Sequence, residues 1–134
     1  MSNRQKYLLL CSCCLTLGCI CYAFFRPDTY IAIVFRKFSL FAQTSPILYV
    51  PILQSFLPDL LWGLALCMGL MAIYDPGLKG AFYCATCSFF CGCIWEALQF
   101  WGFTRGTGDL FDVLMYLFAA ILGILLFRKV RNET

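Results

Sequence analysis

The sequence predicts an all-α integral membrane protein with four transmembrane helices. Its 134 residues are 62% hydrophobic and 13% charged, with a mean hydropathy of +0.81, which excludes a soluble domain that needs a polar surface. Four apolar runs of about 18–21 residues each match a hydrocarbon core of roughly 30 Å. They form one domain, residues 1–134, and cover residues 7–25, 57–74, 81–101 and 110–127.

The first run, residues 7–25, follows Arg4 and Lys6. An apolar run behind basic residues also fits a signal peptide, but its length favours a retained membrane anchor. Arg26-Pro27 ends the run, because proline disfavours helix in the residue before it.

The connection over residues 26–56 is too interrupted by charges and prolines to span a membrane. Within it, Tyr30–Phe41 mixes aromatic, aliphatic and two cationic residues, which fits an interfacial segment lying on the bilayer surface. A short strand or a re-entrant loop is the alternative.

The second run opens with Leu57-Pro58-Asp59. Proline at the first helical position and an acid in the first turn both favour a helix start, so Asp59 is expected either to stabilise that start or to join a site. Asp75-Pro76-Gly77 then predicts a tight turn before the third run.

The lysines and arginines that flank the four runs favour cytoplasmic termini. Six lie on the side of the termini: Arg4, Lys6, Lys79, Arg128, Lys129 and Arg131. The other side has four: Arg26, Arg36, Lys37 and Arg105. We therefore expect a multi-pass protein of the cell membrane, with the turn between the third and fourth runs facing outward.

All ten cysteines lie inside the predicted spans, where cysteine behaves as a small apolar residue. The chain has no histidine, and Cys84-x-x-Cys87 has no second pair at zinc-site spacing. We expect packing, with redox or metal chemistry as the alternative, and we expect no cofactor and no metal. The dispersed basic residues also make a nucleic-acid partner unexpected; membrane lipids are the expected contacts.

Five polar residues gather around the turn between the third and fourth runs, and they form the candidate polar site: Glu96, Gln99, Arg105, Asp109 and Asp112. Charge at the edge of hydrocarbon is costly and usually functional. The structural alternative is that Asp109 and Asp112 cap the fourth helix while Arg105 neutralises Glu96.

The fourth run carries a stripe of Asp112, Tyr116, Ala119 and Gly123. Small residues on one stripe allow close helix packing in membranes, so Asp112 is expected to point into the bundle. A polar pocket in the outer leaflet follows, with Asp59 and Tyr116 as secondary candidates.

The motif Glu96-x-x-Gln99, Arg105, Asp109-x-x-Asp112 resembles the signature of the VanZ-like membrane proteins, over about residues 95–123. Tyr116 stands at that family's asparagine position. The second run also lacks the histidine that many members have.

The resemblance implies a cell-envelope role, and the family is named for a protein associated with resistance to the glycopeptide teicoplanin. We expect a protein that binds a lipid-linked or cell-wall component and so affects antibiotic susceptibility, with Arg105 holding a phosphate or carboxylate. The alternatives are a membrane enzyme acting on a lipid or wall precursor, and an ion- or proton-coupled carrier or assembly subunit. In the enzyme, Glu96 would be the acid or base, or Asp109 and Asp112 would hold a divalent cation.

Overall fold

The computed structural model describes residues 1–25, 34, 37, 51–104 and 108–132, and of residues 22–25 and 51–55 it describes the backbone alone. The regular elements of this described part are all helices, which confirms the all-α class. They are α1 (Asn3–Phe25), α3 (Pro51–Tyr74), α4 (Leu78–Phe100) and α5 (Leu110–Asn132). The predicted interfacial segment lies outside the described residues.

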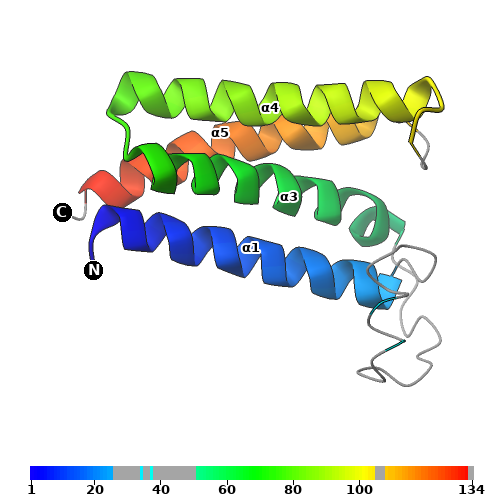
Figure 1. The fold of residues 1–134 in the computed structure, drawn as a ribbon, viewed down its shortest axis with the longest axis horizontal. Coiled ribbons are helices and arrows are strands. Elements are labelled where there is room, and N and C mark those ends of the chain that lie inside the picture. The colour runs from blue at the N-terminus through cyan, green and yellow to red at the C-terminus, as the bar shows by residue number, and fades with distance from the viewer. Residues whose placement is uncertain (26–33, 35–36, 38–50, 105–107, 133–134) are drawn as a thin grey trace.

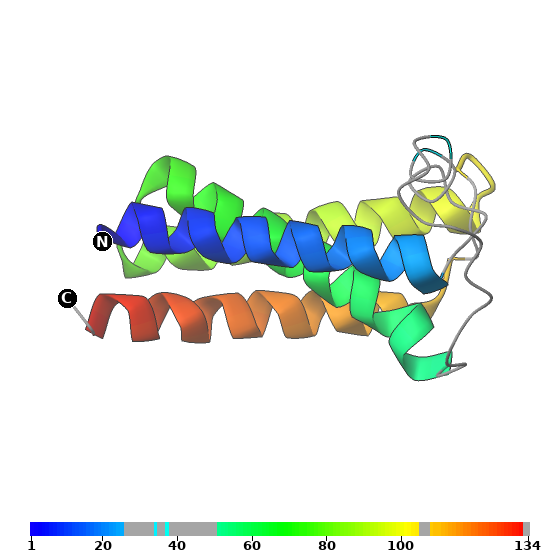
Figure 2. The same ribbon diagram turned by 90° about the horizontal axis from the view of Figure 1, so that it is seen from below.

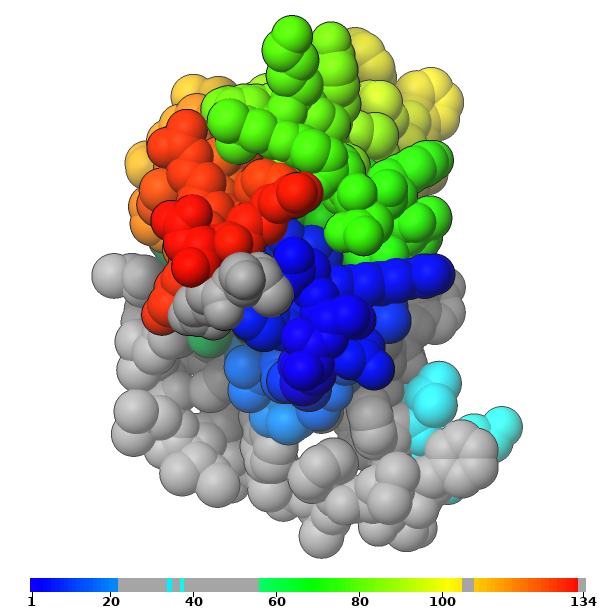
Figure 3. Space-filling view, turned by 90° about the vertical axis from the view of Figure 1, so that its left-hand side faces the viewer, coloured from blue at the N-terminus to red at the C-terminus, as the bar shows by residue number. Residues whose placement is uncertain are grey.

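Consecutive helices run in opposite directions along one bundle (Figure 1). Helix α3 is central and contacts α1, α4 and α5, with α1 and α4 on opposite sides of it. Both termini lie at the same end of the bundle as the turn between α3 and α4 (Figures 2 and 3). The turn between α4 and α5 lies at the opposite end, near the start of α3.

Small residues bring α5 close to α3. A Cβ added at Gly123 would lie 2.5 Å from Cys67 Sγ, and one added at Gly63 would lie 3.0 Å from the Cβ of Ala119. Such contacts need glycine, because any larger side chain would push the helices apart. The small-residue stripe on the fourth run therefore packs as the sequence predicts.

Many large hydrophobic side chains lie on the outside of the bundle, including Tyr83, Phe90 and Phe118. An apolar exterior of this kind suits lipid. Among the described residues, three helical segments are long and apolar enough to cross a membrane: Phe56–Tyr74, Leu78–Phe100 and Leu110–Asn132. Helix α1 forms where the first span is expected, and its passage through the membrane stays a prediction.

Helix α3 begins at Pro51, two turns before the predicted start of the second run. The expectation that Pro58 and Asp59 open this helix is therefore wrong. Proline suits the first helical position, and here Pro51 occupies it. Pro58 lies inside the helix and is fully buried. Asp59 is buried as well, so it faces the bundle instead of capping a helix end.

A hydrogen bond from Arg131 joins the end of α5 to the turn after α3. Arg131 Nη1 donates a hydrogen bond of 2.8 Å to the carbonyl oxygen of Pro76, and the Arg131 guanidinium lies 5.6 Å from the centre of the Phe127 ring. Helix α5 continues to Asn132, beyond the apolar run that ends at residue 127, and this contact lies within the added segment.

Candidate functional site

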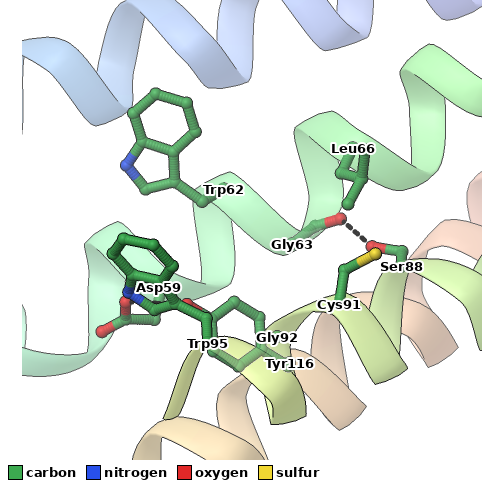
Figure 4. Close-up of a pocket in the computed structure, with 9 residues that line it drawn as sticks. All are labelled: Asp59, Trp62, Gly63, Leu66, Ser88, Cys91, Gly92, Trp95 and Tyr116. Atoms are coloured by element: carbon green, nitrogen blue, oxygen red, sulfur yellow. Dashed lines mark hydrogen bonds between the residues drawn. The ribbon is translucent and has the colours of Figure 1, made fainter. Parts of the chain in front are cut away.

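A pocket of about 510 Å³ lies where α3, α4 and α5 meet (Figure 4). Its volume is within the usual range for small-molecule sites. The residues that line it are Asp59, Trp62, Gly63, Leu66, Ser88, Cys91, Gly92, Trp95 and Tyr116. We call it the α3–α4 pocket.

One face of α3 and one face of α4 form its two long walls. The α3 wall uses residues 59, 62, 63 and 66, and the α4 wall uses residues 88, 91, 92 and 95. Both sets have the i, i+3, i+4, i+7 spacing of a single helix face. Seven residues of helix extend about 10 Å, so the pocket is elongated along the bundle.

The two ends of the pocket differ in chemistry. Because α3 and α4 are antiparallel, Asp59 and Trp95 lie toward the end of the bundle that holds the α4–α5 turn. Leu66 and Ser88 lie at the other end of the pocket, nearer the middle of their helices. The pocket thus has a carboxylate toward the end of the bundle that holds the α4–α5 turn and an aliphatic side chain nearer the middle of the bundle.

Asp59 and Tyr116 meet inside the bundle. The Tyr116 hydroxyl donates a hydrogen bond of 3.2 Å to Asp59 Oδ1, and the two residues are only 7% and 6% exposed. Burial of a carboxylate is unfavourable unless hydrogen bonds compensate it. The hydroxyl therefore stabilises the carboxylate and also ties α5 to α3.

Gly92 makes room for the Tyr116 ring. A Cβ added at Gly92 would lie 2.6 Å from Cδ1 and Cδ2 of that ring, and a Cβ at Gly63 would lie 3.0 Å from its Cδ1. The ring therefore sits between α3 and α4 at two positions that only glycine accommodates without movement.

Ser88 joins the two walls at the deeper end. Its hydroxyl donates a hydrogen bond of 2.7 Å to the carbonyl oxygen of Gly63 (Figure 4). Since that carbonyl lies in the interior of α3, the bond adds a cross-link between helices without breaking either one.

The α3–α4 pocket is open on its outer side. Leu66 is 40% exposed and Trp95 is 48% exposed, and Cys91 is exposed as well. In a bilayer these side chains would face lipid, so the pocket would be entered sideways from the membrane.

In the predicted polar site, at the turn between α4 and α5, the carboxylates of Glu96 and Asp109 accept hydrogen bonds from backbone N–H groups. Glu96 is only 5% exposed, and its Oε2 accepts a hydrogen bond of 3.2 Å from the backbone N–H of Asp109. Asp109 Oδ1 accepts a bond of 3.1 Å from the N–H of Phe111, the second residue of α5. Asp109 is therefore the N-cap of α5, as the capping alternative requires.

Glycines let the chain turn tightly after α4. Gly102 has φ of +75°, and the N–H groups of Gly102 and Phe103 donate to the carbonyls of Gln99 and Leu98, as in a Schellman motif. Gly108 is also restricted, since a Cβ there would lie 2.7 Å from the carbonyl oxygen of Glu96.

Three predicted site residues remain: Gln99, Asp112 and Arg105. Gln99 and Asp112 are half-buried at the end of α4 and in the first turn of α5. Neither is among the described residues that line the α3–α4 pocket. Arg105 lies outside the described residues.

The structure thus brings the predicted residues together in two pairs, Asp59 with Tyr116 and Glu96 with Asp109. The other seven residues that line the α3–α4 pocket were not expected from the sequence. One face of each helix carries a glycine and a tryptophan, Gly63 with Trp62 and Gly92 with Trp95, and this was the signal that could have found them.

The ten cysteines are free thiols. In the part of the chain that the structure describes, no three side chains of cysteine, aspartate or glutamate cluster as metal ligands would. No family model, curated protein or solved structure matches this chain.

Proposed function

We propose that this chain is a VanZ-like membrane protein of the cell envelope that binds an amphiphilic molecule in the α3–α4 pocket. In this proposal all four helices span the membrane, α1 included, and both termini are cytoplasmic. The bound molecule is a lipid-linked or cell-wall component in the outer leaflet.

The observation that carries this proposal is the polarity of the pocket along its length. Asp59 marks its end toward the membrane surface and Leu66 marks its deeper end, about 10 Å away along α3. An amphiphile in the outer leaflet has the same order, with its polar head at the surface and its chain inside. Sideways entry past Leu66 and Trp95 would let the molecule enter without leaving the bilayer.

Binding is favoured over catalysis by the contacts of the carboxylates. Asp59 accepts a hydrogen bond from Tyr116, and Glu96 accepts one from the backbone of Asp109. Both bonds connect helices, which gives each carboxylate a structural role. A general acid or base must also reach a substrate proton, and Glu96 is not among the described residues that line the pocket.

A pocket-filling substitution tests the proposal. Leu66→Trp places a larger side chain at the pocket, and Leu117→Trp is the matched control, because Leu117 is similarly exposed on α5 but is not among the lining residues. Each protein is purified in maltoside micelles and its extracted lipids are analysed by mass.

We expect an enriched lipid with the wild type and Leu117→Trp, and its loss with Leu66→Trp. Equal lipid profiles in all three proteins would contradict binding in the pocket. A lipid whose mass changes on incubation with the wild type alone would point to the enzyme instead. In cells, loss of the bound lipid should be accompanied by altered sensitivity to glycopeptides such as teicoplanin.

A further inference from the structure

The end of the α3–α4 pocket that holds Asp59 combines a carboxylate with aromatic rings. Asp59 lines the pocket together with Trp95 and Tyr116 (Figure 4). Trp62 also lines it, with its indole on the side of α1, where a Cβ added at Gly18 would lie 3.8 Å from its Nε1. Among the described lining residues there is no lysine or arginine. This set of side chains has a recognisable preference for one kind of charge.

Aromatic faces attract cations through their quadrupoles, and tryptophan is the strongest of the three rings. Groups of aromatic residues that surround an ammonium are the usual way in which proteins recognise choline-like ligands. An ammonium beside Asp59 would favour the ionised form of its carboxylate, and low dielectric strengthens the attraction between the two charges. An anionic head at this position would instead be repelled.

The Asp59 carboxylate is also held in place. Its hydrogen bond from Tyr116 fixes its orientation from the α5 side. A carboxylate attracts an ammonium through its charge, which the hydrogen bond from Tyr116 does not remove. Such fixed groups bind more strongly than mobile ones, because less conformational entropy is lost on binding.

We infer that the α3–α4 pocket selects amphiphiles whose head group carries a positively charged ammonium. The ammonium lies between Asp59 and Trp95, and an apolar chain of the amphiphile extends past Gly63 toward Leu66. This inference rests on the proposed function, since it names the kind of molecule that the pocket holds. The ammonium is a primary amine or a quaternary group, because both carry the charge that the pocket recognises.

Fluorescence quenching tests the inference directly, because the chain has three tryptophans and two of them line the pocket. The third, Trp101, is exposed beyond the end of α4, so Trp101→Phe leaves only the two pocket indoles as reporters. The probes are three brominated dodecyl chains that carry a trimethylammonium, a sulfate or an uncharged polyol head. Binding is measured in neutral maltoside micelles.

Two substitutions separate recognition of the head from the effect of overall charge. Asp59→Asn removes the charge but keeps an acceptor for Tyr116, so the protein should still fold. Asp75→Asn makes the same change in net charge at the opposite end of the bundle, at a residue whose φ of +41° asparagine tolerates. Each probe also partitions into the micelle. This partition is the same for all variants in one kind of micelle, so a comparison between variants is not affected by it.

We expect the ammonium probe to bind at least about tenfold more tightly than the other two probes. Asp59→Asn should reduce this preference to within about twofold, and Asp75→Asn should retain it. Equal binding of all three probes, or a preference that survives Asp59→Asn, would overturn the inference while leaving the pocket itself intact. If no probe quenches the wild type and Leu66→Trp changes nothing, the proposed function fails as well.

Discussion

The Tyr116 hydroxyl donates a hydrogen bond to Asp59 across 3.2 Å and joins α5 to α3, between residues that are 57 positions apart. Both side chains are buried, and both line the α3–α4 pocket. The same contact therefore bears on the stability of the bundle and on the chemistry of the pocket.

Tyr116→Phe should destabilise the protein, because it leaves the buried Asp59 carboxylate without this donor. We expect a loss of about 1–3 kcal/mol in the free energy of unfolding. Thermal melting in maltoside micelles measures it. Tyr83→Phe is the control, since Tyr83 is 77% exposed on α4, and it should leave the melting temperature unchanged. Equal melting temperatures for the two variants would show that the hydrogen bond contributes nothing.

Gly92→Ala should destabilise the protein although it adds only one methyl group. The new Cβ would lie 2.6 Å from two atoms of the Tyr116 ring, so either the ring or the helix must move. Overpacking of this kind costs about 1–3 kcal/mol. Gly18→Ala is the matched control, because Gly18 also lies inside a helix and a Cβ there would meet its nearest atoms at an ordinary 3.8 Å. The account would be wrong if both alanines melted at the same temperature as the wild type.

Glu96 should tolerate glutamine better than alanine. Glutamine keeps an oxygen that can accept from the Asp109 N–H, whereas alanine removes it and leaves that donor unsatisfied. We expect Glu96→Ala to lower the free energy of unfolding by about 1–3 kcal/mol and Glu96→Gln by clearly less. If Glu96→Gln retains stability but changes the sensitivity of cells to glycopeptides, the carboxylate charge also has a functional role. Identical losses in both variants would exclude the hydrogen bond as the cause.

The two turns of the helical hairpins should lie on opposite sides of the membrane. Six of the ten lysines and arginines flank the helices at the end of the bundle that holds the termini, which predicts that this end faces the cytoplasm. Epitopes inserted at residue 78 and at residue 103 can be probed with a protease that does not cross membranes. We expect cleavage from outside only at residue 103. Cleavage from the same side at both positions would contradict the orientation.

The sequence predicts the helices well, because runs of apolar residues and the prolines and glycines between them are local signals. The hydrogen bond between Tyr116 and Asp59 has no local signal, since it joins residues from two different helices. The prediction that Asp59 lies at the start of the second helix was wrong, because Pro58 resembles a helix start while α3 begins at Pro51. The capping role of Asp109 was predicted as the alternative to a site, because capping depends only on residues near the helix end.

Photo-crosslinking in native membranes tests occupancy of the α3–α4 pocket most directly. A photoreactive amino acid is placed at position 66, which lines the pocket, or at position 117, which lies on the outside of α5; the native leucines are 40% and 43% exposed. We predict that position 66 captures one amphiphile far above its share of the membrane lipids, and that position 117 captures lipids in proportion to their abundance. The same distribution of captured lipids at both positions would contradict a binding site in this pocket.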